Sequence, residues 1–256
     1  AGFGADLGME KFMDIKMRAM DYMPSAVVIV ASIRALKIHG GVSEDKMNLE
    51  NVEAVKLGLA NLAKHIENVQ QFKVPYVVAL NKFYIDTDAE IKEVMNWAKD
   101  NNHEIALSEV FTNGGEGGLE LAKKVVSQAL KVEKNQPLYP LEMSIKDKVI
   151  KIAKTLYGAD GVDFTEKAEA QILEYDKLGW NKLAICMAKT PLSLSDDPLV
   201  KGRPQNFRIT VREFKPSLGA GFLVALTGDV MTMPGLPKLG AYQNMDLVGD
   251  KIFGLF

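Results

Sequence analysis

The sequence lacks the features that mark secreted, membrane-spanning and nucleic-acid-binding proteins. Cys186 is the only cysteine among 256 residues, so no disulfide can form within the chain, as is usual in a reducing compartment. No apolar run approaches the roughly 20 residues that a membrane-spanning helix requires. The formal net charge of −2 gives no electrostatic reason to bind nucleic acid or an anionic membrane. We therefore expect a cytoplasmic protein whose partners are neither nucleic acids nor membranes.

Several motifs that carry chemistry are also missing. No Gly-x-x-x-x-Gly-Lys-Ser/Thr stretch occurs, so these residues contain no P-loop for phosphate. The histidines, His39, His65 and His103, have neither metal-binding spacing nor an evident common face, and no metal site is predicted. His65 is expected to be structural, whereas His39, in a predicted strand-and-turn segment, could approach a ligand. The apolar neighbours of Cys186 favour an inert buried thiol over a nucleophile.

What is present is the composition of a globular protein, 47% hydrophobic and 25% charged. Before residue 135, apolar runs typical of buried strands alternate with amphipathic helical patterns. This alternation predicts right-handed βαβ units and a parallel sheet. Strands are expected at 26–33, 74–80 and 103–107, and helices at 51–72, from Thr87 to about Lys99 and from Leu119 to about Val132.

A proline-containing segment at 135–140 is typical of a linker. Helical patterns follow it, and Asp163 is placed to cap the second of them. The alternating run at 207–214 indicates a half-exposed strand. After the linker, helices are expected at 144–157 and 165–177, and strands after 183, at 207–214 and at 219–226.

Two glycine-rich turns are candidates for ligand contact. Residues 1–8 hold three glycines before a helical pattern, and Gly114–Gly118 hold four before another. Backbone N–H groups in such turns can approach a ligand closely, and a helix N-terminus favours an anion. A chain that begins inside a ligand turn also leads us to expect part of the protein upstream. For the second turn, a plain strand-to-helix connection is an equally good interpretation.

Phe83 and Phe111 each follow a predicted strand. Ligands of open α/β sheets bind beyond the carboxyl ends of the strands, where two aromatic faces could hold a flat heteroaromatic ring. From the pattern alone, burial in the core is the favoured alternative. The Ser195-Asp196-Asp197 cluster invites a metal or acid–base role, but the proline that follows favours a turn.

Short motifs along the whole chain carry a family signature. They lie at 2–8, 10–12, 14–16, 35–37, 39–41, 61–62, 64–68, 114–118, 186–190, 193–198, 201–204, 227–229 and 231–237. Their order closely resembles formate–tetrahydrofolate ligase, or 10-formyltetrahydrofolate synthetase. The resemblance spans essentially all 256 residues and covers the carboxy-terminal part of the family's chain.

The resemblance implies a pterin site. Phe83 matches the aromatic residue that stacks on the pterin of tetrahydrofolate, and Phe111 matches the opposite aromatic, commonly Trp. Phenylalanine there should keep the stacking and lose the indole N–H donor. Tyr84 stands where proline is usual, and the loop with Gly114 and Gly115 is expected near the folate.

A nucleotide site is implied as well. Phe3 is expected near the adenine, in a turn with Gly4 and Gly8. Arg203 and Pro204 are expected to close the same site from the last domain. For Arg203, a surface ion pair is the commoner fate of an isolated arginine.

For the whole chain, the expected fold is α/β, with the remnant of a parallel-sheet core like that of P-loop NTPases and two smaller α/β lobes. Residues 1–72 would end the large nucleotide-binding domain, 73–140 would form a βαβ lobe with the pterin site, and 141–256 a carboxy-terminal α/β lobe.

The implied activity is the ATP-dependent joining of formate to tetrahydrofolate through formyl phosphate. It implies ATP with Mg²⁺, tetrahydrofolate as substrate, and a monovalent cation as a further candidate. The family's P-loop lies in its amino-terminal portion, so that portion is the expected partner and this chain alone should be inactive. The resemblance implies a homo-oligomer, typically a tetramer, and identifies no catalytic residue here. The alternative is a non-catalytic folate-binding or assembly module.

Overall fold

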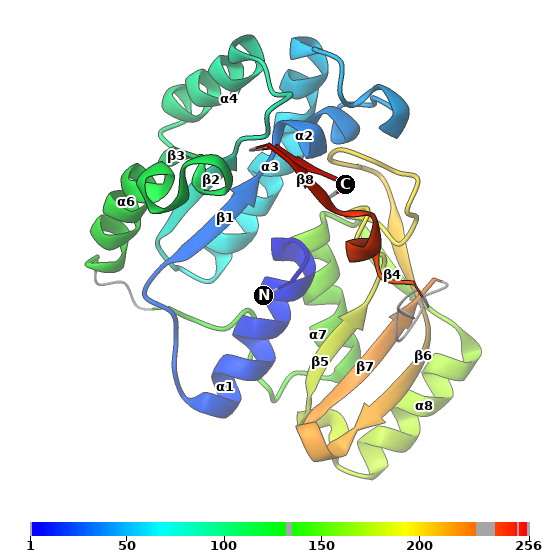
Figure 1. The fold of residues 1–256 in the computed structure, drawn as a ribbon. Coiled ribbons are helices and arrows are strands. Elements are labelled where there is room, and N and C mark those ends of the chain that lie inside the picture. The colour runs from blue at the N-terminus through cyan, green and yellow to red at the C-terminus, as the bar shows by residue number, and fades with distance from the viewer. Residues whose placement is uncertain (1, 132–134, 229–238, 250, 255–256) are drawn as a thin grey trace.

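The computed structural model describes residues 2–131, 135–228, 239–249 and 251–254. It shows two lobes, each built on its own sheet, with a helical amino-terminal segment between them (Figure 1). The α/β class expected from the sequence is confirmed. Ala1 and the family segment at 231–237 lie outside the described residues. None of the described helices is long and apolar enough to cross a membrane.

The first sheet is parallel and three-stranded. Its strands, in spatial order, are β1 (Val27–Ala31), β2 (Tyr76–Asn81) and β3 (Ile105–Ser108). Val78 in the central strand pairs with Ile29 on one side and Ile105 on the other. All three strands fall within or next to the predicted apolar runs. Because β1 pairs only with β2, it is an edge strand of this sheet.

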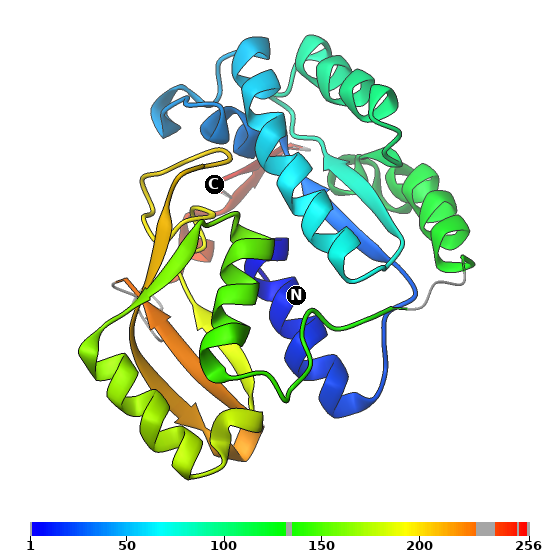
Figure 2. The ribbon, with the colours of Figure 1, turned by 180° about the vertical axis from the view of Figure 1, so that it is seen from behind.

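The helices of this lobe follow the expected βαβ pattern, and Figure 2 shows α3 lying across the sheet. Thr87 and Glu90 form the predicted capping box at the start of α4. His39, however, is the last residue of α2 and does not lie in a strand-and-turn segment. This helix begins directly after β1, where Ser32 caps it by accepting a hydrogen bond from the Ala35 N–H. The elements are α2 (Ile33–His39), η3 (Glu44–Lys46), α3 (Val52–Gln71), α4 (Asp88–Asp100), α5 (Val110–Asn113), η4 (Gly114–Gly118) and α6 (Leu119–Ala129).

The second lobe has a mixed sheet in the order β4-β6-β7-β5, in which only the β6–β7 pair is antiparallel. Its strands are β4 (Gly161–Phe164), β5 (Ala184–Ala188), β6 (Arg208–Ser217) and β7 (Phe222–Thr227). The other elements of this lobe are α7 (Ile145–Ile152), η5 (Ala153–Tyr157), α8 (Glu166–Lys177), η6 (Trp180–Lys182) and η7 (Leu218–Ala220). Near the carboxyl terminus, η8 (Ala241–Asn244) precedes β8 (Asp246–Val248) and β9 (Lys251–Phe253), which form a separate two-stranded antiparallel sheet.

The predicted cap of α8 is wrong. Asp163 lies inside β4, where its carboxylate binds the Arg208 guanidinium at 2.7 Å. Thr165 caps the helix, with its side chain accepting a hydrogen bond from the Ala168 N–H. The pairing of β4 with β6 holds Asp163 in extended backbone, so the next available oxygen takes the cap position.

The amino-terminal segment belongs to the core of the second lobe. It runs through η1 (Ala5–Met9), η2 (Phe12–Lys16) and α1 (Met17–Met20). Met9, Met13 and Met17 are buried in one cluster with Ile185 and Met187 of β5. The first sheet has a separate core. The division into 1–72, 73–140 and 141–256 stays a prediction.

Candidate functional site

A cavity of about 550 Å³ lies where the amino-terminal turn, the first sheet and the second lobe meet. This volume is within the range typical of small-molecule sites, about 300–1,000 Å³. Of the residues predicted for a nucleotide, Phe3 and Gly4 line the cavity, whereas Gly8, Arg203 and Pro204 lie outside its lining. The other polar lining residues include Asp6, Ser32, His39, Asn61, His65 and Ser193.

The glycine turn is closely packed at Gly4 and Gly8. The Gly4 carbonyl accepts hydrogen bonds from the N–H groups of Leu7 at 3.1 Å and Gly8 at 3.0 Å. A Cβ on Gly8 would lie 1.7 Å from the Gly2 carbonyl oxygen, and one on Gly4 would lie 2.7 Å from His65 Cε1. Phe3 is 78% exposed while lining the cavity. The turn therefore presents one aromatic face from a tightly fixed backbone.

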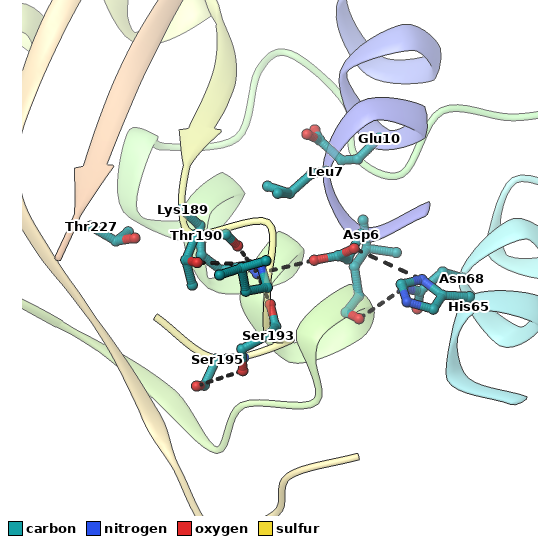
Figure 3. Close-up of polar contacts among 12 residues, drawn as sticks. Asp6, Leu7, Glu10, His65, Asn68, Lys189, Thr190, Ser193, Ser195 and Thr227 are labelled. Carbon is teal, nitrogen blue, oxygen red and sulfur yellow. Dashed lines mark hydrogen bonds and ion pairs between the residues drawn. The ribbon is translucent and has the colours of Figure 1, made fainter. Parts of the chain in front are cut away.

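A buried charge network joins this turn to both lobes (Figure 3). Lys189 Nζ lies 3.0 Å from Asp6 Oδ2, and both side chains are buried. Asp6 Oδ1 lies 3.8 Å from Nδ1 of His65. Burial lowers the pKa of His65, so its ring is neutral near pH 7 and the ionic partner of Asp6 is Lys189. Burial also lowers the pKa of Lys189, and the adjacent Asp6 opposes that change.

Helix α3 presents different chemistry to each lobe. Lys64 Nζ donates to the Thr155 carbonyl at 2.7 Å, and Asn68 Nδ2 donates to the Leu156 carbonyl at 2.9 Å. Both carbonyls belong to the end of η5, where helical C=O groups lack partners of their own. α3 therefore joins the second lobe by hydrogen bonds and, at Val69, by apolar contact. It joins the first sheet by apolar contact through Val55, Leu59, Leu62 and Ile66.

Gly202 is held in the same interface. Its N–H donates to His39 Nδ1 at 3.1 Å, and its carbonyl accepts from Asn61 Nδ2 at 2.8 Å. Burial, with smaller contributions from His65 and Lys201, lowers the pKa of His39 to about 4. The ring is therefore neutral, with Nδ1 free to accept. The next residue, Arg203, forms a two-bond ion pair with Glu67, both bonds 2.7 Å, so the surface ion pair considered for it is present.

Phe83 and Phe111 lie just beyond the carboxyl ends of β2 and β3, where the sequence placed them. Phe83 is half-buried, with the Arg34 guanidinium carbon 5.1 Å from its ring centroid. Phe111 is 68% exposed. Lys82 Nζ lies 2.9 Å from Glu109 Oε1, which ties the loop of one phenylalanine to that of the other.

The second glycine turn is a short 3₁₀ turn, η4. Gly114 has φ +57°, in a region that L residues rarely adopt. A Cβ on Gly114 or Gly115 would meet no atom within 4 Å, so space remains open beside both. The Gly117 carbonyl accepts a hydrogen bond from the Glu109 N–H at 3.0 Å. This contact fixes the turn close to Phe111.

Two simpler interpretations are supported. Asp197 Oδ1 accepts from the Leu199 N–H at 2.8 Å, and Asp196 Oδ2 accepts from the Thr210 N–H at 2.9 Å. Both carboxylates therefore organise backbone, as the turn interpretation predicts. Cys186 is half-buried in β5, and burial raises the pKa of its thiol, which favours an inert group.

Comparison with known protein families matches residues 1–256 to the family described as formate–tetrahydrofolate ligase. The chain belongs to this family. Formate–tetrahydrofolate ligases are ATP-dependent enzymes of one-carbon metabolism that use tetrahydrofolate as substrate. The resemblance seen in the motifs is thus confirmed. The pterin and nucleotide residues named from it stay predictions for this ligase chain.

Sequence reasoning missed the residues that hold the ligase lobes together. The contacts of Lys64 and Asn68 could have been expected from the sequence. These polar residues, four apart, lie on the face of α3 opposite its apolar stripe. The contact between Asp6 and Lys189 could not have been expected, because it joins opposite ends of the chain.

Proposed function

We propose that this chain is the carboxy-terminal part of an enzyme that ligates formate to tetrahydrofolate with ATP. A formate oxygen attacks the γ-phosphorus of ATP, forming formyl phosphate and releasing ADP. The folate N10 amine then attacks the formyl carbon, loses its proton and expels phosphate. The product is 10-formyltetrahydrofolate. Phosphoryl transfer of this kind depends on positioning and charge neutralisation.

The carboxyl edge of the first sheet is the observation on which this proposal depends. All three strands run parallel, so their carboxyl ends share one edge. Ser32, just after β1, lines the cavity, while Phe83 and Phe111 follow β2 and β3. Ligands of open α/β sheets bind at such an edge. Nucleotide and pterin would thus lie side by side, as formyl transfer between them requires.

On the nucleotide side, Phe3 supplies an exposed ring that can stack on adenine, each such stack contributing about 1 kcal/mol beyond area burial. Gly4 and Gly8 allow the close packing that fixes this ring. Arg203 and Pro204 would approach from the second lobe. On the pterin side, the faces of Phe83 and Phe111 would enclose the ring, and the open space at Gly114 and Gly115 would admit it.

The family's amino-terminal, P-loop-bearing portion is the proposed partner. The chain has no P-loop of its own. The edge strand β1 exposes Val28 by 40% and Val30 by 69%, although parallel sheets are usually covered on both faces. Both side chains line the cavity proposed for the nucleotide, so a partner domain that covers this apolar face would also enclose that cavity. We propose that this chain is inactive alone and that the assembled enzyme is a cytoplasmic homo-oligomer.

Among residues 2–131, 135–228, 239–249 and 251–254, no three His, Cys, Asp or Glu side chains are placed to hold a metal ion together. Mg²⁺ bound with ATP usually takes one or two carboxylates besides the phosphates and water, and we propose that the partner portion supplies them. A monovalent cation remains a further proposed ligand of the assembled enzyme.

The test is reconstitution. This chain is mixed with its amino-terminal counterpart, and ADP release is followed with and without formate and tetrahydrofolate. ADP that depends on both substrates supports the ligase, and no turnover by the folded pair contradicts it. Tetrahydrofolate binding without turnover in any pairing would instead favour the folate-binding module.

Two variants locate the pterin site. Phe83→Ala and Phe111→Ala should each weaken tetrahydrofolate binding about tenfold, given the loss of a stacked ring. Tyr22→Ala is a control matched to Phe111→Ala, because Tyr22 is an aromatic residue of similar exposure, 61% against 68%, remote from β2 and β3 in sequence. Unchanged folate affinity in both phenylalanine variants would exclude this site.

A further inference from the structure

Lys189 connects two walls of the cavity that come from opposite ends of the chain. One wall is the glycine turn with Asp6, and the other is the segment after β5 that includes Ser193. Lys189 Nζ lies 3.0 Å from Asp6 Oδ2 and donates to the Thr190 carbonyl at 3.0 Å. It also donates to the Ser193 carbonyl. Figure 3 shows the ammonium between these groups.

The Lys189 ammonium has no donor to spare. An ammonium carries three N–H bonds, and three protein oxygens receive them. The side chain is 0% exposed, and its Nζ lies 5.0 Å from the centroid of the Tyr157 ring. In this arrangement Lys189 cannot bind a phosphate directly. Its chemistry suits holding the two walls together.

We propose that Lys189 is a positioning residue of the nucleotide site, which fixes the glycine turn and the 190–194 segment to each other. The inference rests on the proposed function, because it takes the cavity between these walls as the nucleotide pocket. Phe3 on one wall and Leu194 on the other then keep their spacing.

Removing the ammonium would separate the walls. Lys189→Met leaves the Asp6 carboxylate and two carbonyl groups without partners in a buried place, which is strongly unfavourable. Admitting water between the walls relieves that cost. The nucleotide then loses a fixed surface, whereas the loops of Phe83 and Phe111 stay on β2 and β3.

The kinetic test uses this chain paired with its amino-terminal counterpart. Lys189→Met should raise KM for ATP by about tenfold, because the displaced turn would no longer hold Phe3 against the adenine, a stacking contact of about that size. KM for tetrahydrofolate should change by less than about twofold, as expected for a distant site. Asp6→Asn keeps an oxygen acceptor without the charge and should give a smaller rise in KM for ATP.

Lys148→Met is the matched control. Lys148 is also 0% exposed, and its Nζ donates to the carbonyls of Asn181 at 2.5 Å and Leu183 at 3.0 Å. It does not line the cavity. This variant should lose stability as Lys189→Met does, with KM for ATP unchanged. An equal rise in the two variants would overturn the positioning role.

Amide hydrogen exchange of this chain alone gives a second readout. In Lys189→Met, exchange should accelerate at the N–H groups of Leu7 and Gly8, which bind the Gly4 carbonyl, and not in β2. Unchanged exchange in the turn, or an unchanged KM for ATP, would overturn the inference. Failure of the wild-type pair to make ADP would instead refute the proposed function, and the exchange result would still decide whether Lys189 holds the turn.

Discussion

Glu10 should make the protein less stable as pH rises. Its side chain is 0% exposed, and neither carboxylate oxygen has a hydrogen-bond partner. Burial is the main cause that raises its pKa from 4.5 to about 8, and Lys11, 3.8 Å away, offsets only part of this. The folded protein therefore holds a proton on Glu10 at pH values where the unfolded chain has released it.

The sign and size follow from proton linkage. Because the folded state binds more protons between pH 4.5 and about 8, stability falls through this window and is level above it. Each pH unit in the window costs about 1.4 kcal/mol. The total is roughly 3–5 kcal/mol. Glu10→Gln resembles the protonated acid in shape and cannot ionise. The free energy of unfolding of Glu10→Gln should equal that of the wild type at pH 4.5 and exceed it by roughly 3–5 kcal/mol at pH 8.

The assay is urea unfolding of both proteins at several pH values from 4.5 to 8.5. The difference between the two free energies of unfolding isolates Glu10 from other titrating groups. Leu173→Ala, at a 63% exposed position on α8, is the control because it changes no titrating side chain, and its difference from the wild type should not vary with pH. A flat difference for Glu10→Gln as well would show that the folded carboxyl ionises normally, and would refute the reasoning.

Two further predictions concern a helix cap and a histidine. Thr87→Ala removes the side-chain acceptor of the Glu90 N–H and should lower the free energy of unfolding by about 1 kcal/mol. Thr87→Ser keeps a hydroxyl acceptor and should retain most of this stabilisation, and urea unfolding measures both variants. The His39 ring should titrate near its lowered pKa of about 4 in an NMR titration. Since the folded state then binds fewer protons, stability should fall as pH drops from 6.5 toward 4, and a midpoint at or above 6.5 would contradict the burial argument.

Local sequence patterns predicted the first sheet well. The apolar, β-branched run that includes Val27–Ala31 forms the predicted parallel strand, although Val28 and Val30 are exposed and the strand is not buried as expected. The capping box at Thr87 is a signal contained within four residues. The carboxyl-end positions of Phe83 and Phe111 followed from these strands. Such features depend on neighbours in sequence, so the sequence alone carries them.

Features that depend on distant partners were not predictable in the same way. Asp163 and Thr165 both carry oxygens that can cap α8, and only the pairing of β4 with β6 decides between them. Likewise, Met9, Met13 and Met17 have a helical spacing, but nothing local shows that they pack on β5. The predicted roles of Phe3 and Arg203 depend on ligand contacts and stay predictions.

The chemistry of α3 explains how one helix can serve two lobes of different composition. Three of its hydrogen bonds to the second lobe end on the main-chain carbonyls of Thr155, Leu156 and Gly202, while Glu67 pairs with the Arg203 side chain. A backbone acceptor persists whatever side chain occupies its position, so the geometry of these three contacts depends on the donors on α3. The opposite face of the same helix packs on the sheet whose carboxyl edge carries the pterin candidates. A shift of α3 would therefore move the cavity and the pterin loops together. The fixed spacing of the polar donors on α3 prevents such a shift by holding the helix in one position against the second lobe.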